Sequence, residues 1–143
     1  MSFSKFAPVF WMFAGAAITL GVVSATRSNA APPNHVFELR MYHVAPGKFD
    51  ALQQRFRDHV LAAFARHNMK PVGFWLPQDA PDAGNLLIYV LEHPSRADAD
   101  KDWAAFNADP AWMKAKAESE VNGKLVEKAD RYFMDPADFS PIK

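Results

Sequence analysis

The hydrophobic period of this chain changes near residue 45, and that change limits the fold more than any other feature. Residues 35–43 alternate, with Phe37, Leu39 and Met41 on one side, which is the period of a strand with one apolar face. Between about residues 48 and 67, apolar residues recur at steps of three and four, which predicts an amphipathic helix of about 20 residues. A strand that leads directly into such a helix favours a sheet with helices packed on it.

Three further strands and two further helices complete the pattern. Lys70–Leu76, rich in Val, Phe and Trp, predicts a second strand. Asn85–His93 is almost unbroken in apolar residues, as in a central strand that is covered on both faces. Two helices are expected to begin after Ser95 and at Asp109-Pro110, because serine and aspartate side chains accept backbone N–H bonds at a helix start. Leu125–Met134 predicts the last strand.

This order of elements, βαββαβ, predicts a ferredoxin-like α+β fold, a four-stranded antiparallel sheet with its helices on one face. The other face is then left uncovered, and we expect Trp75, Leu87, Tyr89 and Leu91 to lie on it. An apolar face of that size rarely stays in contact with water. The sequence therefore predicts a homodimer in which two sheets close into a dimeric α+β barrel.

Residues 1–30 have the composition of an export signal. Lys5 is the only charged side chain among residues 1–23, and residues 6–23 form an apolar run that small residues follow. We expect cleavage after Ala30, which leaves residues 31–143 as one domain in the periplasm or outside the cell. The alternative is an uncleaved membrane anchor, since roughly 18 apolar residues approach the length that spans a bilayer.

The composition excludes several classes of function. The chain has 16 basic and 16 acidic residues, and removal of Lys5 and Arg27 with the signal leaves a net charge of about −2, so no attraction to nucleic acid is expected. There is no cysteine, which excludes disulfides, thiolate metal sites and cysteine nucleophiles. The sequence lacks a phosphate-binding glycine loop and a nucleophile elbow. No metal site is expected, because the five histidines are not spaced as ligands.

His59 is the strongest candidate for a catalytic residue. Its helical spacing from Leu52 and Phe56 predicts that its ring turns toward the sheet, and an imidazole can act as a base near neutral pH. The alternative is a partly buried histidine that a neighbour holds by a hydrogen bond for packing. His43 and His93 are at strand ends, where we expect them to be solvated.

Arg40, Tyr42, Trp75 and Trp103 are expected to bind a ligand. Arg40 and Tyr42 share the polar side of the first strand, where arginine can hold a carboxylate and tyrosine can donate a hydrogen bond. The structural alternative for Arg40 is an ion pair with Glu38 or with an acid on the neighbouring strand. The two tryptophans belong to an aromatic set that either encloses a flat ligand, such as a quinone, a polyketide or haem, or forms part of the core.

Several segments resemble those of the NIPSNAP family, whose members belong to the dimeric α+β barrel superfamily. The matching segments span residues 36–143 and are Phe37–Tyr42, Pro46–Lys48, Arg55–His59 with Phe64 and His67, Val72–Trp75, Leu87–Tyr89, Trp103–Phe106 with Asp109–Trp112, and Asp138–Pro141. The resemblance implies the fold and the dimer described above. It implies no particular reaction, because the family is known by its fold rather than by an agreed activity.

Two classes of function remain. In the first, a pocket between the sheet and the helices binds a small apolar or aromatic molecule. The superfamily includes cofactor-free monooxygenases, isomerases and haem-dependent enzymes, so the resemblance adds a monooxygenase-like or haem-binding enzyme as an alternative. In the second class, the domain is a noncatalytic module that binds another exported protein. Both classes stay open because a fold does not settle a function.

Overall fold

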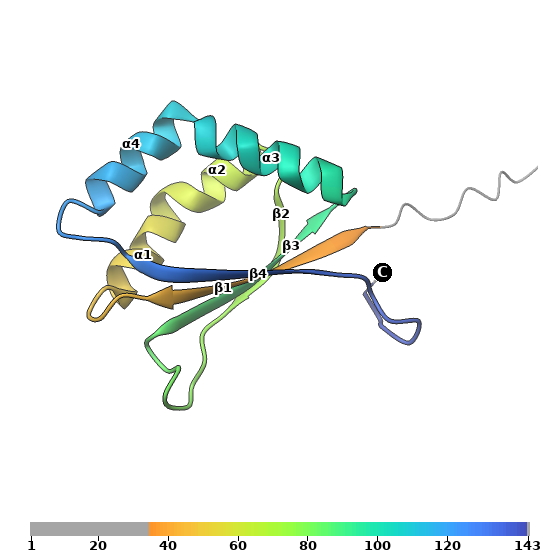
Figure 1. The fold of residues 1–143 in the computed structure, drawn as a ribbon, viewed down its shortest axis with the longest axis horizontal. Helices are drawn as coiled ribbons and strands as arrows, with labels where there is room; N and C mark the ends of the chain where they lie inside the picture. Colours follow the sequence, from red (N-terminus) through yellow and green to blue (C-terminus); the bar gives the residue numbers. More distant parts are fainter. Residues whose placement is uncertain (1–34, 143) are drawn as a thin grey trace, which may run out of the picture.

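A computed structural model describes residues 35–142 and shows a four-stranded sheet covered by helices (Figure 1). The elements follow in the order β1 (Val36–Val44), α1 (Phe49–Arg55), η1 (Phe56–Val60), α2 (Leu61–Arg66), β2 (Lys70–Trp75), β3 (Leu86–His93), α3 (Arg96–Ala108), α4 (Pro110–Ser119) and β4 (Val126–Met134). The strands pair in the spatial order β2-β3-β1-β4, and each pairing is antiparallel. The predicted ferredoxin-like α+β fold is confirmed. The predicted signal peptide, residues 1–30, lies outside the described residues.

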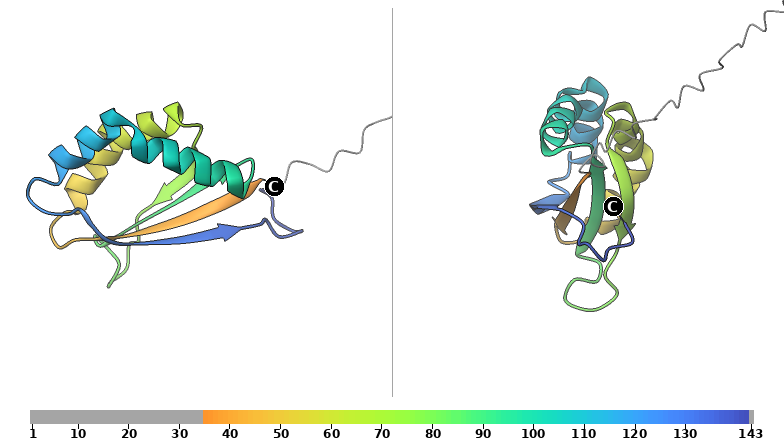
Figure 2. Two further views of the ribbon diagram at one scale, coloured as in Figure 1. Left: turned by 45° about the horizontal axis from the view of Figure 1, so that its top comes forward. Right: turned by 90° about the vertical axis from the view of Figure 1, so that its right-hand side faces the viewer.

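The helices lie on one side of the sheet, and no described element covers the other side (Figure 1, Figure 2). Helices α3 and α4 begin at the two predicted caps. The Ser95 hydroxyl accepts the Asp98 N–H at 3.1 Å, and the Asp109 carboxylate accepts the Ala111 N–H at 2.8 Å. These bonds satisfy N–H groups that the first turn of a helix leaves without a partner. Asp109 therefore sets the break between α3 and α4.

The spacing of apolar residues predicts one continuous helix over the first helical stretch, but the structure shows an interruption. A π-helical turn, η1, separates α1 from α2. Val60, four residues after Phe56, completes nearly a full turn of this wider helix, lies on the same side as Phe56 and is 3% exposed. Leu52, Phe56, Val60 and Phe64 together form the apolar stripe that packs on the sheet.

The covered face of the sheet carries aromatic and charged side chains together. Tyr89 of β3 is fully buried, and its ring lies 5.6 Å from the Phe56 ring between centroids. The strand register pairs Tyr89 with Arg40, and residues directly opposite each other on two strands point to the same face. Arg40, together with Glu38 and Tyr42 at alternate positions of β1, therefore points toward the helices.

The uncovered face carries the apolar residues of β1 and their neighbours. We call this surface the open face; it is formed by Leu39, Met41, Ile88, Val90, Trp75 and Tyr132. Leu39 lies between Val90 on β3 and Tyr132 on β4. Trp75 and Tyr132 are 50% and 55% exposed. The apolar side of the first strand therefore faces away from the helices.

The predicted membership of the open face is wrong for three residues. Leu87, Tyr89 and Leu91 lie on the covered side of β3 and are buried. Of the four predicted residues, Trp75 alone lies on the open face. Because β3 is apolar on both sides, its own pattern does not distinguish the two faces. The distinction comes from pairing with the charged side of β1.

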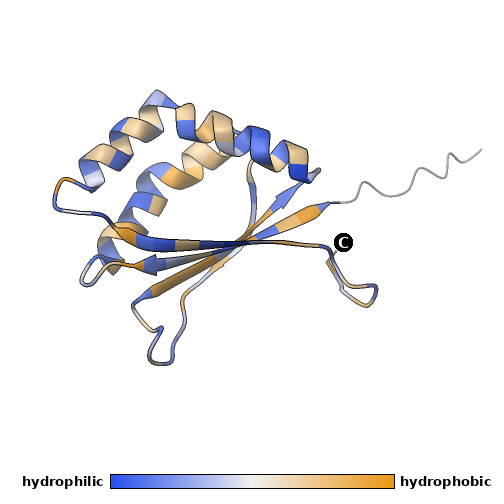
Figure 3. Ribbon diagram, viewed as in Figure 1, coloured by the Kyte–Doolittle hydropathy of each residue, from blue (hydrophilic) through white to orange (hydrophobic). Residues whose placement is uncertain are grey.

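The last strand is confirmed in spite of its charged residues. β4 is mostly hydrophilic (Figure 3), yet it pairs with β1 from Val126 to Met134. Within residues 35–142, no helix has the length and apolar character needed to cross a membrane. The same residues contain no group of three or more histidine, aspartate or glutamate side chains placed to hold a metal ion.

Candidate functional site

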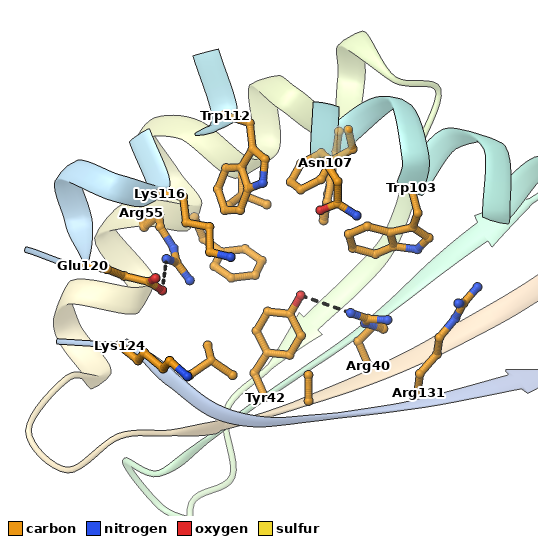
Figure 4. A pocket seen from close by; sticks show the side chains of 16 residues that line it. Arg40, Tyr42, Arg55, Trp103, Asn107, Trp112, Lys116, Glu120, Lys124 and Arg131 are labelled. Atoms are coloured by element: carbon orange, nitrogen blue, oxygen red, sulfur yellow. Dashed lines mark hydrogen bonds and ion pairs between the residues drawn. The ribbon is translucent and has the colours of Figure 1, made fainter. Parts of the chain in front are cut away.

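A cavity of about 420 Å³ lies between the covered face and the helices (Figure 4), within the size range of small-molecule sites. Aromatic side chains form much of its wall: Tyr42, Phe56, Phe64, Trp103, Phe106 and Trp112. The charged side chains in its lining are five cations and one carboxylate: Arg40, Arg55, Lys116, Lys124, Arg131 and Glu120. The cavity therefore combines flat apolar surfaces with an excess of positive charge.

Tyr42 is placed as a hydrogen-bond donor to the cavity. Its hydroxyl oxygen accepts a hydrogen bond from the Tyr89 hydroxyl at 2.8 Å. It accepts another from Arg40 Nη2 at 3.5 Å, which Figure 4 shows as a dashed line. Because a hydroxyl has two acceptor positions and one proton, the Tyr42 proton is left for a group in the cavity. Burial raises the pKa of Tyr89 well above its usual range, which keeps that phenol protonated as a donor.

Arg40 lies beside Tyr42 and stacks on an indole ring. The guanidinium carbon is 4.6 Å from the centroid of Trp103, and Nη1 donates to Glu38 at 3.2 Å. Its buried Nε has no hydrogen-bond partner in the described chain. Burial lowers the pKa of Arg40, but Tyr42, Tyr89 and Glu38 raise it by more. Arg40 therefore presents a fixed positive charge and an unused donor; we call this part of the cavity the Arg40 end.

Glu38 holds the Arg40 end in place. Its carboxylate is fully buried and accepts hydrogen bonds from Trp103 Nε1 at 2.7 Å and His93 Nε2 at 2.9 Å, while Arg131 Nε lies 2.9 Å away. Burial raises the pKa of Glu38, but these two hydrogen bonds and the guanidiniums of Arg131 and Arg40 outweigh burial and lower it. Glu38 is therefore an ionised carboxylate that orients both Trp103 and Arg40.

The opposite part of the cavity, which we call the lysine end, is formed by α1, α4 and the segment before β4. Arg55 donates to Glu120 at 2.8 Å and lies over the Trp112 ring at 5.4 Å from its centroid. Burial raises the pKa of Glu120, but the hydrogen bond and charge of Arg55, the Leu125 N–H and the charge of Lys116 together outweigh burial and lower it. Lys116 and Lys124 reach toward the cavity (Figure 4), and neither ammonium forms a salt bridge with a described residue.

A family model for NIPSNAP proteins matches residues 37–141. The chain belongs to the NIPSNAP family. The match spans nearly all of the sheet and every described helix, so the resemblance found in the short sequence motifs is confirmed. No match was found among curated proteins.

Solved structures of other NIPSNAP proteins share this fold. A NIPSNAP family protein with unknown function from Agrobacterium tumefaciens is 23% identical, with 78% of this chain and 96% of that chain covered and a TM-score of 0.67. A NIPSNAP-like domain protein from Burkholderia xenovorans is 18% identical, with 77% of this chain and 91% of that chain covered and a TM-score of 0.65. Outside the family, a mutant of SnoaB, a cofactor-independent oxygenase from Streptomyces nogalater, is 14% identical, with 77% of this chain and 99% of that chain covered and a TM-score of 0.50. At these identities the likeness establishes the fold alone.

Three of the four predicted ligand-binding residues come together in the cavity of this NIPSNAP protein. Arg40, Tyr42 and Trp103 all line it, on β1 and α3. The structural alternatives also hold, because Arg40 pairs with Glu38 and Trp103 packs against the hydrophobic core. The same side chains therefore stabilise the fold and shape the cavity.

Trp75, the fourth predicted ligand-binding residue, does not line the cavity. It pairs with Ile88 on the open face, and its indole lies over Gly73, where an added Cβ would come 2.8 Å from a ring carbon. Residues 74 and 75 point to opposite faces of β2, and it is Phe74 that contacts Phe56 under the helices, at 5.8 Å between centroids. Trp75 is therefore part of the open face.

His59 lies on the outer surface of η1 and is exposed. The prediction that its ring turns toward the sheet is wrong, because in the wider π-turn the third residue after Phe56 falls further short of a full turn, which leaves His59 outside. His59 does not line the cavity. A role for His59 as a base in this cavity therefore has no geometric support.

His93 also differs from its expected place. It is fully buried rather than solvated, because β3 is a central strand that also contacts α3. Its Nε2 bonds to Glu38, and its Nδ1 has no partner in the described chain. His43 is 39% exposed, and its Nε2 lies 2.7 Å from the Asp130 carboxylate. His93 therefore supports the cavity from behind Glu38, and His43 does not.

Sequence reasoning placed Trp112 in the aromatic set but missed the charged residues of the lysine end. Trp112, Lys116 and Glu120 line the cavity from α4 and its C-terminal end. They recur at steps of four, the spacing that places residues on one side of a helix. That spacing was the available signal for a shared helix side. A search for apolar stripes does not find it, because two of the three side chains are charged.

The cavity does not fit haem. Haem iron is held in proteins by histidine, cysteine, methionine or tyrosine side chains. The lining contains no histidine, cysteine or methionine. Its one tyrosine, Tyr42, has its oxygen occupied by hydrogen bonds from Tyr89 and Arg40. The haem alternative therefore finds no ligand in this lining.

Proposed function

We propose that this NIPSNAP protein is an exported homodimer that binds a small aromatic molecule in the cavity between the covered face and the helices. The supporting observation is the combination of aromatic walls with donors that have no partner in the described chain, Arg40 Nε and the Tyr42 hydroxyl proton. Flat rings pack well against aromatic side chains such as Trp103. A few placed donors orient a ligand through its oxygen atoms.

The proposed dimer rests on the open face. Leu39, Met41, Ile88 and Val90 are only partly buried in a single chain, and Trp75 is half exposed. Burial of apolar surface is favourable by about 25 cal/mol per Å², and a two-fold dimer lets one surface pack against its own copy. Analytical ultracentrifugation at micromolar concentration is expected to show a dimer. A monomer at that concentration contradicts this part of the proposal.

A noncatalytic module that binds another exported protein is the competing function. Such a module would explain the open face, since a different protein could cover it. It gives no role to the cavity or to the unpaired donor of Arg40. Ligand binding therefore accounts for more of the structure than protein binding alone.

Fluorescence titration with N-phenyl-1-naphthylamine, an uncharged compound with a phenyl and a naphthyl ring, tests ligand binding in the cavity. Ala129 lines the cavity from β4, so Ala129→Phe places a ring inside it. Ala104→Phe is the matched control, because Ala104 is exposed on α3 and does not line the cavity. We expect Ala129→Phe to weaken binding by at least about tenfold, equivalent to about 1.4 kcal/mol, and Ala104→Phe to leave it unchanged.

Two results contradict the proposal of a ligand cavity. Equal binding by the original protein and Ala129→Phe would place the compound elsewhere, for example on the open face. The proposal would also be contradicted if neither this compound nor any of a broad set of ring compounds bound to the protein or raised its melting temperature. Circular dichroism of both variants shows whether each one keeps the fold.

Mass spectrometry of the protein after expression in a Gram-negative host tests the proposed export. A periplasmic product that begins at Ala31 is the expected result. A full-length product in the membrane fraction supports the anchor instead, and a full-length product in the cytoplasm contradicts export.

A further inference from the structure

Among the described residues, acids pair with both lining cations at the Arg40 end of the cavity, but with only one of the three at the lysine end. At the Arg40 end, Arg40 and Arg131 both contact Glu38, and Arg131 Nη2 also lies 2.9 Å from Asp100. At the lysine end, Arg55 is matched by Glu120 at 2.8 Å. Lys116 and Lys124 are the two lining cations that form no salt bridge with a described residue.

The unmatched lysines are next to an aromatic surface. Lys116 is four residues after Trp112 on α4, so the two side chains lie on the same side of that helix. Figure 4 shows the Lys116 and Lys124 side chains extending toward the space beneath Trp112, from opposite sides of the lysine end. A molecule whose ring fills the cavity therefore brings its edge within reach of two ammonium groups.

We propose that the molecule bound in the cavity is an aromatic acid, whose acidic group pairs with Lys116 and Lys124 and whose ring lies among Tyr42, Trp103 and Trp112. This proposal rests on the proposed function, since it names the class of molecule that the same cavity takes. An anion at the lysine end gives a salt-bridge partner to two ammonium groups that have none among the described residues. An ammonium pairs with a carboxylate or a sulfonate through a charge-assisted hydrogen bond.

The Arg40 end selects a neutral oxygen rather than a second acid. Arg40 and Arg131 already form ion pairs with Glu38, and Arg131 also pairs with Asp100, so a second anion would compete with these carboxylates for the two guanidiniums. The unused donors there, Arg40 Nε and the Tyr42 proton, can each serve a carbonyl or hydroxyl oxygen. The ligand class is therefore an aromatic acid with a neutral oxygen substituent at the far end of its ring system.

Two fluorescent compounds that differ by one acidic group test the charge preference. 8-Anilino-1-naphthalenesulfonate has the ring system of N-phenyl-1-naphthylamine with an added sulfonate. We expect the protein to bind the sulfonate at least about tenfold more tightly at low salt, a difference of about 1.4 kcal/mol. Because salt screens exposed charges, the preference is expected to shrink as the salt concentration rises, while the affinity for the uncharged compound stays constant or increases.

A double variant and a matched double control assign the preference to the two lysines. Lys116→Gln/Lys124→Gln is expected to bind both compounds within about twofold of each other, a difference near 0.4 kcal/mol. Lys114→Gln/Lys128→Gln has the same net charge, but neither Lys114 nor Lys128 lines the cavity. This control is expected to keep the full preference.

The possible results separate the two proposals. Equal affinity for the two compounds in the original protein, or a preference that survives in Lys116→Gln/Lys124→Gln, overturns the aromatic acid while the cavity remains a binding site. A preference lost equally in both double variants also overturns it, because overall charge then explains the effect. Binding of both compounds that Ala129→Phe leaves unchanged, or no binding of either, overturns the ligand cavity and the aromatic acid together.

Discussion

The two faces of the sheet in this NIPSNAP protein reverse the usual arrangement of polar and apolar residues. On β1, the charged and polar side chains of Glu38, Arg40 and Tyr42 lie under the helices, whereas Leu39 and Met41 face away from them. Buried charges are retained only where other charges and hydrogen bonds compensate for the lost water. An apolar face in the open, in turn, indicates a partner surface.

This difference assigns a separate role to each face. The covered face combines a buried carboxylate, a guanidinium with an unused donor and a cavity of about 420 Å³. The open face contributes no residue to that cavity and is formed by apolar residues together with half-exposed Trp75 and Tyr132. A side chain on the covered face should therefore affect ligand binding and folding, and one on the open face should affect assembly.

Replacement of the buried carboxylate on the covered face is expected to have the largest effect. Glu38→Gln removes the negative charge that compensates Arg40 and Arg131, and loss of one partner from a buried ion pair costs about 3 kcal/mol of unfolding free energy. Urea denaturation at one fixed protein concentration measures it. Glu127→Gln, at an exposed position of β4, is the control and should stay within about 0.5 kcal/mol. A loss below about 1 kcal/mol for Glu38→Gln would show that Glu38 is not the centre of the covered face.

A charge placed on the open face is expected to separate the two copies. Val90→Asp puts a carboxylate beside Leu39 on the central pair of strands, where a second sheet would bury it. We expect the dimer to dissociate at least about 100-fold more readily, equivalent to about 2.7 kcal/mol, as measured by analytical ultracentrifugation. Ala62→Asp, on the exposed surface of α2, should leave the dimer intact. If Val90→Asp dimerises as strongly as the original protein, the open face is not the interface.

The fold could be predicted from the sequence because hydrophobic period and helix caps are local signals. The alternation of β1 and the caps at Ser95 and Asp109 each identify their element without knowledge of its neighbours. The π-turn could not be predicted in this way, since the spacing around His59 fits an ordinary α-helix. The placement of His59 therefore failed even though the helix itself was found.

The cavity was predicted in part, for reasons that depend on strand pairing. Arg40 and Tyr42 were found because they share the polar side of the first strand and can bind a ligand through charge and hydrogen bonds, and Trp103 because it belongs to an aromatic set. The faces of Leu87, Tyr89 and Leu91 depend on which residues of β1 lie beside them, and a strand that is apolar on both sides contains no such information. The steps of four along α4 show that the residues of the lysine end share one side of the helix, but they do not show how that side packs over the sheet.

A smaller effect is expected for the indole that lies under Arg40. Trp103→Phe keeps an aromatic ring but removes the Nε1 hydrogen bond to Glu38, and a hydrogen bond to a charged group contributes about 1.5 kcal/mol. Trp112→Phe is the matched control, because Trp112 lines the same cavity and packs against the core. Urea denaturation should show that Trp103→Phe costs more than Trp112→Phe. Equal costs would mean that the ring alone, and not its bond to Glu38, stabilises this face.

The smallest expected effect is a change in the pH dependence of folding. The pKa of Glu38 is lowered in the folded protein, because the hydrogen bonds and charges around it outweigh burial. Its stabilising contribution is therefore complete above the unfolded pKa of about 4.3 and is lost as the pH falls through the lower folded pKa. Between pH 6 and pH 3, the stability of Glu38→Gln should fall less steeply than that of the original protein. Parallel curves would contradict an ionised Glu38.

A crystal structure of the protein grown with 8-anilino-1-naphthalenesulfonate tests the separate roles of the two faces most directly. We predict the naphthalene ring among Tyr42, Trp103 and Trp112, the sulfonate beside Lys116 and Lys124, and the open face covered by a second copy. A compound bound on the open face with the cavity empty, or an open face exposed to solvent in a monomeric crystal, would contradict this division of roles.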